Sequence, residues 1–377
     1  MLTNTQKDEL WHAYHEHRPT RIPVMLRTNP RIIVLDAQLN HNGYKFEQVQ
    51  TDACAHVEIS LQHAHYVRTV LNQFTDGPAG LPDCWEVYYY CYNIYEAAAF
   101  GAEVCYPPDQ VPCTEPFLTE ANKREIFDCD IEHPFENRFI KQSLAFWREM
   151  ERICADMRYE GRPVRLMPFA LTGTDGPFTA GCNLRGADFL LDFMEDADYA
   201  ARLMELVTRA ATIRRRAFER YWGNRIATGN WLADDSCAMI SVPMYRERVM
   251  PYHRQYYDAA GGDIPRWMHL CGDATHLFPV MKNELGVSSF DTGFPVNHGE
   301  LRRSLGPDVE IAGGPEAGLL LNGTPDDVWN RTRDILLSGV KSGGRFILAE
   351  GNNLPPACPP DNLKAMYASC LEFGFCE

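Results

Sequence analysis

The chain has 377 residues, of which 45% are hydrophobic and 23% charged, so collagen-like, low-complexity and wholly disordered proteins are excluded. Lys and Arg number 36 against 51 Asp and Glu, and the resulting net charge of −15 argues against electrostatic binding to nucleic acid or to an anionic membrane. The sequence has no apolar run of 18 residues, and its first residues have no apolar signal-peptide core, so we expect a soluble cytoplasmic protein. Thirteen scattered cysteines fit a reducing compartment.

The N-terminal half of the chain predicts mainly helices. Residues 3–17 are polar with apolar residues at helical spacing, which indicates an amphipathic helix before a strand at 21–26. Residues 46–71 lack Gly and Pro and predict one long helix, and residues 137–159 predict another. The segment 85–95 is rich in aromatic residues and is compatible with a strand or with the wall of a site.

From Val164 onward, short apolar runs alternate with helical patterns, which is typical of repeated βα units. The predicted strands are Val164–Leu171, Ile226–Leu232, Arg266–Leu270, Ser288–Phe290, Val309–Ala312 and Phe346–Leu348. Helices are predicted to begin near Asp188, Pro243, Ala274, Gly299, Pro325 and Pro360. Six such units, with one or two more in the N-terminal half, favour an α/β fold of the (β/α)8 TIM-type barrel class. We expect one barrel domain over residues 1–377, with 1–20 as an N-terminal helical extension. An open doubly wound sheet is the alternative, although no Gly-x-Gly-x-x-Gly motif follows a predicted strand.

Barrel enzymes have their reacting groups at the C-terminal ends of the strands. His269 and Cys271 lie at such an end, two residues apart, so both side chains can point the same way and hold one ion. Cys358 follows the last predicted strand, where a third ligand would be needed. Three protein ligands with an open position are the pattern of catalytic zinc, and thiolates favour zinc over magnesium or calcium. Two ordinary core residues are the alternative interpretation of the His-x-Cys pair.

Several segments together resemble the uroporphyrinogen decarboxylase superfamily over residues 160–375. They are Met268-His269-Leu270-Cys271-Gly272, Asp291, Ile311-Ala312-Gly313-Gly314, Ile347-Leu348-Ala349-Glu350-Gly351, the Pro-rich segment around Cys358 and Gly176-Pro177-Phe178-Thr179. Within that superfamily, His-x-Cys with a distant Cys resembles the zinc-dependent, corrinoid-linked methyltransferase branch. The decarboxylase has an Arg-Gln-Ala-Gly-Arg-Tyr segment after its first strand, whereas this chain has Leu26-Arg27-Thr28-Asn29-Pro30-Arg31.

The resemblance implies a zinc ion bound by His269, Cys271 and Cys358. Asp291 is the first choice for a fourth ligand, Glu350 the second, and substrate or water the third; a helix cap is the alternative role of Asp291. The resemblance also implies methyl transfer between a small methylated substrate and cobalamin bound to a separate corrinoid protein, because this chain has no Asp-x-His-x-x-Gly cobalamin motif. We leave open whether the chain forms a homodimer.

The aromatic residues of segment 85–95 are suited to enclose an aryl methyl ether or a quaternary amine, and O-demethylation is the favoured reaction. Packing in the core is an alternative use of these rings. We predict that Asp234 and Asp235 orient the substrate or its leaving group, unless they are simply a solvated helix start. The predicted substrate-binding residues are Thr174, Asp175, Tyr89 and Asn230. Transfer from methylcobalamin to a thiol is one alternative. A decarboxylase in which Arg27 and Arg31 bind substrate carboxylates is another. A barrel that binds a corrinoid or tetrapyrrole without turnover is the non-enzymatic alternative.

Overall fold

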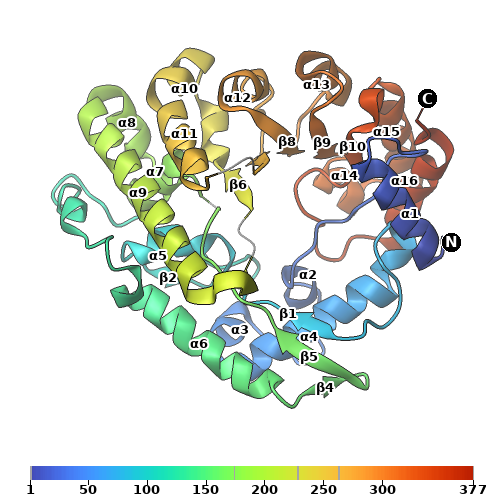
Figure 1. Cartoon of the computed structure of the whole chain (residues 1–377), viewed down its shortest axis with the longest axis horizontal. Helices are drawn as coiled ribbons and strands as arrows, with labels where there is room; N and C mark the ends of the chain where they lie inside the picture. Colours follow the sequence, from blue (N-terminus) through green and yellow to red (C-terminus); the bar gives the residue numbers. More distant parts are fainter. Residues whose placement is uncertain (1, 174, 227–228, 262–263, 377) are drawn as a thin grey trace.

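The computed structural model of the chain describes residues 2–173, 175–226, 229–261 and 264–376. Figure 1 shows strands arranged in a ring, with most helices on its outside. The α-helices are α1 (Asn4–His15), α2 (Arg31–Val34), α3 (Phe46–Thr51), α4 (Ala53–Thr69), α5 (Tyr95–Ala99), α6 (Arg138–Cys154), α7 (Pro177–Arg185), α8 (Asp188–Glu195), α9 (Ala197–Trp222), α10 (Val242–Arg248), α11 (Met250–Ala259), α12 (Phe278–Leu285), α13 (His298–Leu305), α14 (Ala317–Asn322), α15 (Pro325–Leu337) and α16 (Pro360–Phe373). The strands are β1 (Trp85–Val87), β2 (Val104–Cys105), β3 (Cys113–Thr114), β4 (Arg158–Tyr159), β5 (Arg162–Leu166), β6 (Asn230–Ala233), β7 (Arg266–Leu270), β8 (Val287–Thr292), β9 (Glu310–Gly313) and β10 (Phe346–Leu348).

Parallel pairing joins the strands of the ring. One sheet has the order β10-β9-β8-β7-β6, and β1 pairs in parallel with β5. Val24 forms a parallel bridge to Leu348, which places the segment 21–26 beside β10 as the first strand of the ring. The Ala233 amide donates to the Gly173 carbonyl at 2.8 Å, which joins β6 to the segment that follows β5. These contacts confirm the predicted (β/α)8 barrel.

The predicted elements agree best with the observed ones where burial imposes a simple apolar pattern on the sequence. β7 and β10 match their predicted ranges at both ends, and α15 and α16 begin at the predicted prolines. The single helix predicted for 46–71 is wrong, because the chain breaks at Asp52 into α3 and α4. The Asp52 carboxylate accepts hydrogen bonds from the amides of Cys54 and Ala55, so it caps the second helix instead of continuing the first.

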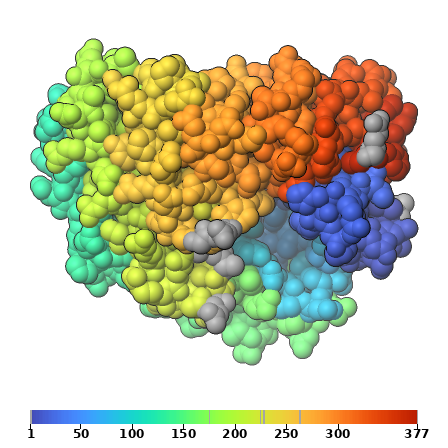
Figure 2. Space-filling model, turned by 45° about the horizontal axis from the view of Figure 1, so that its top comes forward, coloured from blue at the N-terminus to red at the C-terminus, as the bar shows by residue number. Residues whose placement is uncertain are grey.

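Helix α1 closes the end of the barrel where the strands begin. Tyr14 is fully buried against Ala312 and Ile347, and its hydroxyl donates to Glu310 Oε2 at 2.8 Å. The C-terminal residues lie close by, because the Cys376 amide donates to the Thr20 carbonyl at 3.0 Å. Figure 2 shows the blue N-terminal residues against the orange and red residues of the C-terminal part. The functional site must therefore open at the opposite end, where the strands finish.

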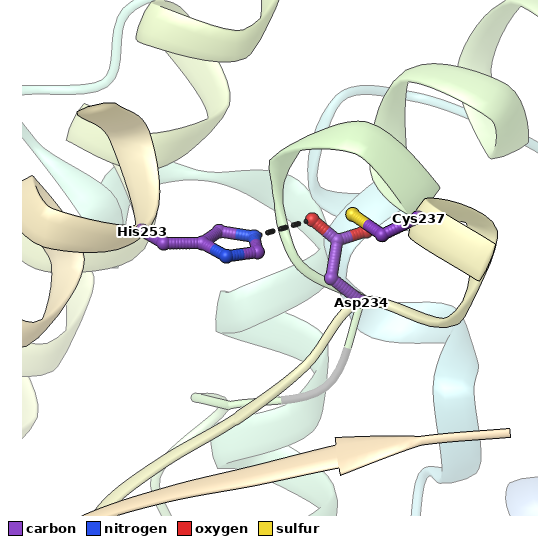
Figure 3. Close-up of side chains that lie close together, drawn as sticks. All are labelled: Asp234, Cys237 and His253. Atoms are coloured by element: carbon purple, nitrogen blue, oxygen red, sulfur yellow. Dashed lines mark hydrogen bonds and ion pairs between the residues drawn. The ribbon is translucent and has the colours of Figure 1, made fainter. Parts of the chain in front are cut away.

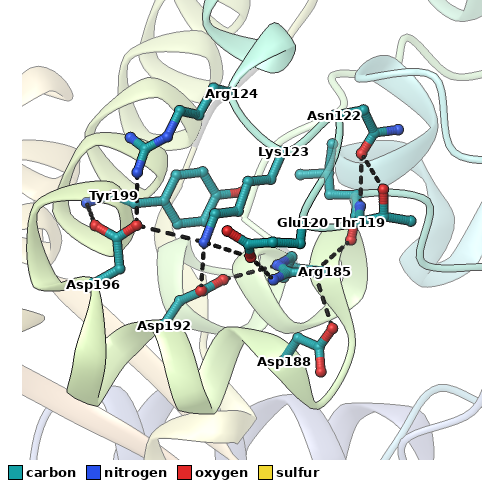
Figure 4. Close-up of polar contacts among 11 residues, drawn as sticks. Thr119, Glu120, Asn122, Lys123, Arg124, Arg185, Asp188, Asp192, Asp196 and Tyr199 are labelled. Atoms are coloured by element: carbon teal, nitrogen blue, oxygen red, sulfur yellow. Dashed lines mark hydrogen bonds and ion pairs between the residues drawn. The ribbon is translucent and has the colours of Figure 1, made fainter.

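A buried charge network attaches the long segment before α6 to the outer helices α7 and α8. Lys123 is 3% exposed and lies 2.7 Å from Asp192, which also accepts a hydrogen bond from Arg185 at 2.8 Å. Arg185 further contacts Asp188 and Glu120, each at 2.9 Å (Figure 4). The network fixes the outer wall of the barrel where α7 ends and α8 begins.

Among the described residues, none of the helices combines the length and the apolar character that crossing a bilayer requires.

Candidate functional site

The His-x-Cys pair lies at the C-terminal end of β7, as the sequence predicts. His269 is the fourth residue of β7, and Cys271 follows the strand directly. A side chain at Gly293, the residue after β8, would come within 2.7 Å of the Cys271 Cα atom, so only glycine allows the two strand ends to approach this closely. The close approach brings polar groups from neighbouring strands to one point.

His269, Cys271 and Asp235 form a compact cluster of possible metal ligands, with one atom of each residue within 4.8 Å of the other two. His269 Nε2 lies 2.9 Å from Cys271 Sγ and 3.8 Å from Asp235 Oδ1. The Cys271 amide donates to the same Asp235 oxygen at 2.6 Å, which holds the Asp235 carboxylate beside the thiol. An imidazole, a thiol and a carboxylate on a partly open surface are a donor set that fits zinc.

Asp291 and Arg27 lie on the other side of the imidazole. Asp291 Oδ2 is 2.9 Å from His269 Nδ1, and Arg27 Nη1 is 2.7 Å from Asp291 Oδ1. Burial opposes protonation of His269, but Asp291 and Cys271 outweigh it and hold the pKa of His269 well above its usual value. The geometry favours a role for Asp291 in orienting the imidazole instead of the predicted fourth-ligand role. Asp291 is not a helix cap, because Asn297 caps the helix that follows.

Glu350 and Cys358 follow β10 and do not belong to this cluster. Glu350 is fully buried, accepts a hydrogen bond from the Arg27 amide at 2.8 Å, and has no partner for Oε2 in the described part of the chain. Burial raises its pKa to about 7. The Cys358 thiol donates to the Leu320 carbonyl at 3.3 Å, and burial raises its pKa to about 12. Ligation by Cys358 or Glu350 therefore stays a prediction.

Asp234 does not have the role that its sequence position suggested, because it is completely buried. Its carboxylate accepts hydrogen bonds from the Phe178 amide at 3.1 Å and from the amide and hydroxyl of Thr179 at 2.7 Å each. It also accepts one from His253 Nε2 at 2.8 Å, and Tyr245 donates to the other nitrogen of His253 at 3.0 Å. Figure 3 shows His253 pointing at Asp234, with Cys237 beside the carboxylate. Burial excludes a solvated helix start for Asp234 and argues against its predicted contact with the substrate.

The buried Asp234 also explains the Gly-Pro-Phe-Thr segment. A side chain at Gly176 would approach the Asp234 side chain to 2.7 Å, and the next residues begin α7 with their free amides aimed at the carboxylate. Asp234 therefore joins the end of β6 to the start of α7. Its neighbour Asp235 is turned the other way and has a side chain that is 35% exposed, which leaves Asp235 available to the metal-ligand cluster.

The aromatic segment divides between a cavity and the core, because Tyr88 and Tyr90 face one side of the chain and Tyr89, which lies between them, faces the other. Trp85, Tyr88 and Tyr90 line a cavity of about 440 Å³ between this segment and α4. Tyr89 points the other way, packs against Phe169 with ring centroids 5.0 Å apart, and donates to Ser143 at 3.2 Å. These contacts argue against the predicted substrate-binding role of Tyr89, which stays a prediction, and its two neighbours face the open space.

The other predicted substrate-binding residues have different positions. Asn230 is the first residue of β6, so it lies at the N-terminal end of the barrel, away from the cluster. Its side-chain Nδ2 donates to the Tyr257 carbonyl at 3.3 Å. This position argues against a substrate-binding role for Asn230, and it arises because the observed strand starts four residues later than the predicted one. Asp175 is 6% exposed and accepts a hydrogen bond from Asn183 at 3.0 Å; burial and nearby carboxylates raise its pKa well above the usual value. Thr174 lies outside the described residues.

Sequence reasoning missed His253 and underestimated Arg27. His253 lies on α11 and has no motif around it, so only its contact with Asp234 shows its importance. Arg27 was considered as a ligand for substrate carboxylates, whereas its guanidinium contacts Asp291 at 2.7 Å and the Glu350 carbonyl at 3.3 Å. The position of Arg27 directly after the first strand is the feature of the sequence that could have indicated its place at the site.

Two similar proteins of Methanosarcina mazei have names that refer to methyl transfer. The chain is 36% identical over 146 residues to a methylated-thiol–coenzyme M methyltransferase of Methanosarcina mazei, covering 38% of this chain and 37% of that protein. It is 21% identical over 201 residues to the methylcobamide:CoM methyltransferase MtbA of the same organism, covering 53% and 57%. The matched segments thus span well under two thirds of these relatives.

A solved structure and a family model match nearly the whole chain. A methyltransferase from Methanosarcina mazei superimposes with a TM-score of 0.65 over 99% of each chain, at 16% sequence identity, which supports the fold. The family model described as uroporphyrinogen decarboxylase (URO-D) matches residues 5–373. The chain therefore belongs to the uroporphyrinogen decarboxylase family.

Proposed function

We propose that this protein is a zinc-dependent methyltransferase that moves a methyl group between a small methylated substrate and cobalamin carried by a separate corrinoid protein. The observation that carries the proposal is the cluster of His269, Cys271 and Asp235 at the C-terminal end of β7, with one ligand atom of each within 4.8 Å of the others. The names of the relatives support the reaction class, since they include a methylcobamide and coenzyme M.

His269 and Cys271 would hold the zinc ion, with Cys358 or Asp235 as the third ligand. When bound, zinc supplies a Lewis acid that polarises the oxygen or sulfur atom carrying the methyl group, or that lowers the pKa of a thiol. Asp291 orients the imidazole through Nδ1, and Arg27 holds Asp291 in place. Access from outside remains, because the side chains of Asp291 and Asp235 are 22% and 35% exposed.

We favour an aryl methyl ether as the substrate, so that the reaction is an O-demethylation. The cavity lined by Trp85, Tyr88 and Tyr90 supports this choice, because aromatic walls suit a planar ring. A thiol is the second candidate, and the coenzyme M named in both relatives favours it, since coenzyme M carries a thiol.

The contacts of Arg27 argue against the decarboxylase alternative. A decarboxylase of this kind needs arginines free to bind substrate carboxylates, whereas the Arg27 guanidinium contacts Asp291 and the Glu350 carbonyl. A role limited to binding a corrinoid or tetrapyrrole would leave the His269–Cys271–Asp235 cluster without a purpose.

The test combines the zinc-loaded protein with cob(I)alamin or methylcobalamin and follows the spectral change between Co(I) and methyl-Co(III). Cob(I)alamin is offered 2-methoxyphenol, a methylamine or a methyl thioether, and methylcobalamin is offered 2-mercaptoethanesulfonate. We expect turnover with the methoxyphenol that is lost in His269→Ala and kept in the control Cys129→Ser, a partly buried thiol after the 3-10 turn Glu125–Asp128. Turnover with the thiol alone would favour the second candidate. Turnover with neither, also when a corrinoid protein encoded nearby is supplied, would contradict the proposal.

A further inference from the structure

A short hairpin between α5 and α6 places two cysteines directly opposite each other. β2 and β3 pair antiparallel, and their register sets Val104 against Thr114 and Cys105 against Cys113. In the described part of the chain, these are the only cysteines that lie in strands. Opposite residues of an antiparallel pair have their Cα atoms about 4.5–5.5 Å apart, and a disulfide spans Cα separations of about 4.4–6.8 Å. The register therefore allows the two sulfur atoms to bond.

The fold holds the hairpin in place without help from the thiols. Val104 packs against one hydrophobic cluster of the core, and Tyr106 packs against the other. Because side chains alternate along a strand, Cys105 faces the opposite side, which it shares with the cysteine across the register. The chain after β3 is also fixed, since the Phe117 amide donates to the Leu184 carbonyl of α7 at 3.1 Å. The two cysteines are thus held opposite each other before any bond joins them.

The loop that joins the two strands is short and stiff. Residues 106–112 include Pro107, Pro108 and Pro112, and the ring of each proline fixes its φ angle. Closing a short loop costs little entropy, and a stiff loop leaves few conformations in which the strands separate. Two thiols linked in this way have a high effective concentration with respect to each other. Each thiol should therefore react with the other in preference to a thiol from solution.

The two thiols differ in their surroundings. Cys113 is exposed, whereas Cys105 is partly buried. Partial burial and a hydrogen bond to the Glu115 carboxylate raise the pKa of the Cys105 thiol, and Glu103 acts in the same direction. Cys113 is therefore the thiol that a reagent in solution meets first. Neither cysteine belongs to the two groups of possible metal ligands found among the described residues, so a metal site is not the better interpretation of the pair.

We propose that Cys105 and Cys113 are a site of reversible oxidation, at which a low-molecular-weight disulfide converts the two thiols into a disulfide across the hairpin. The Cys113 thiolate attacks one sulfur atom of the reagent and releases one thiol. The Cys105 sulfur atom then attacks the Cys113 sulfur atom of this mixed disulfide and releases the second thiol.

The reaction is balanced without any further co-reactant. Two S–H bonds of the protein and the S–S bond of the reagent break, and one S–S bond forms between Cys105 and Cys113. The two electrons and the two protons end in the two small thiols that are released. Exposed disulfides are readily reduced, so an excess of thiol should reverse the reaction. The inference is independent of the proposed methyl transfer.

The experiment equilibrates the full-length zinc-loaded protein with 2-mercaptoethanol and 2-hydroxyethyl disulfide, blocks the remaining thiols with N-ethylmaleimide and maps the peptides by mass spectrometry. We expect the peptide with Cys105 and Cys113 to carry no maleimide and to lack two hydrogen atoms. The disulfide should be favoured at least about tenfold more in the folded chain than in guanidinium, because only the folded chain has the register. Cys54, an exposed thiol on α4, is the internal control and should form only a mixed disulfide.

Two variants assign the order of the steps. Cys105→Ser should stop the reaction at a mixed disulfide on Cys113, and Cys113→Ser should react more slowly than the wild type. A disulfide that is equally favoured in the folded and the unfolded chain would overturn the proposal, because the fold would then contribute nothing. Mixed disulfides alone at both cysteines, or a bond from either of them to a third cysteine, would also overturn it. Resistance of the bond to excess 2-mercaptoethanol would contradict its reversibility.

Discussion

Asp291 Oδ2 lies 2.9 Å from His269 Nδ1, the ring nitrogen that faces away from Cys271. An ion held between His269 Nε2 and Cys271 Sγ would therefore be on the far side of the imidazole from this carboxylate oxygen. This geometry distinguishes residues that would bind a metal from residues that would orient its ligands. Mutation of a ligand and mutation of an orienting residue should therefore have different effects on metal binding.

Loss of Asp291 should weaken zinc binding without abolishing it. We expect Asp291→Asn to lower zinc affinity about 10- to 100-fold, the usual effect of removing a carboxylate that orients a histidine ligand. His269→Ala and Cys271→Ser should leave the purified protein without zinc. Competition with a chromophoric chelator gives the affinities, and Cys129→Ser is the thiol control. Complete loss of zinc in Asp291→Asn would make Asp291 a ligand after all.

The third ligand can be identified by a second pair of variants. We expect Cys358→Ser to lose zinc as fully as Cys271→Ser, because thiolates bind zinc more strongly than carboxylates. Asp235→Asn should lose less, since Asp235 Oδ1 already accepts the Cys271 amide at 2.6 Å. Metal analysis of both purified variants shows which of the two residues is the third zinc ligand. Zinc retained in Cys358→Ser but absent from Asp235→Asn would show that Asp235 is the ligand and that Cys358 only bonds Leu320.

Asp234 should matter more for stability than an exposed aspartate does. Asp234→Ala leaves the Phe178 amide, the Thr179 amide and His253 buried without their partner, so we expect a loss of about 3–5 kcal/mol in the free energy of unfolding. Urea denaturation measures the change. The control is Asp273→Ala at an exposed position, which should stay within about 0.5 kcal/mol of the wild type. Equal effects of the two substitutions would refute the structural role of Asp234.

The charge network of Figure 4 gives a matched comparison between a buried and an exposed carboxylate. Asp192 has a side chain that is 8% exposed and contacts both Lys123 and Arg185, so Asp192→Asn should cost about 3 kcal/mol of unfolding free energy. Asp188 has a side chain that is 60% exposed and, among the described residues, forms an ion pair with Arg185 alone, so Asp188→Asn should cost less than about 1 kcal/mol. Thermal or urea unfolding that ranks them in the opposite order would contradict this account.

The buried His56 should make the fold sensitive to acid. Burial lowers its pKa from 6.5 to about 4, and His63 and His298 are lowered to about 4 as well. The unfolded chain therefore binds more protons than the folded chain between pH 6.5 and 4, so stability is complete above pH 6.5 and falls as the pH drops toward 4. Each histidine contributes about 3 kcal/mol to this loss.

The measurement is the unfolding free energy between pH 7.5 and 4.5 for the wild type and for His56→Gln. The variant should be less stable at neutral pH but lose less stability on acidification, because it lacks one of the three buried histidines with a lowered pKa. The comparison uses slopes, so a general destabilisation by glutamine does not affect it. Identical slopes would show that His56 is already protonated in the folded protein or exposed to solvent.

Much of the barrel follows from local patterns in the chain. The sequence predicts β7, β10 and the starts of α15 and α16 correctly, because buried apolar runs and N-terminal prolines act over only a few residues. The break at Asp52 could not be predicted in this way, because the helical spacing of apolar residues continues across it. Only the hydrogen bonds by which the Asp52 carboxylate caps α4 show that there are two helices.

The sequence by itself determined the barrel class, the family and the His269–Cys271 pair, since residues two apart at the end of a strand must point the same way. Only the tertiary structure decided between neighbours that look equivalent along the chain. It buries Asp234 against α7 and leaves Asp235 partly exposed, and it turns Tyr89 into the core and Tyr88 and Tyr90 toward a cavity. The physical reason is that these choices depend on partners such as His253, Thr179 and Ser143, which are distant in sequence and meet only when the helices close around the sheet.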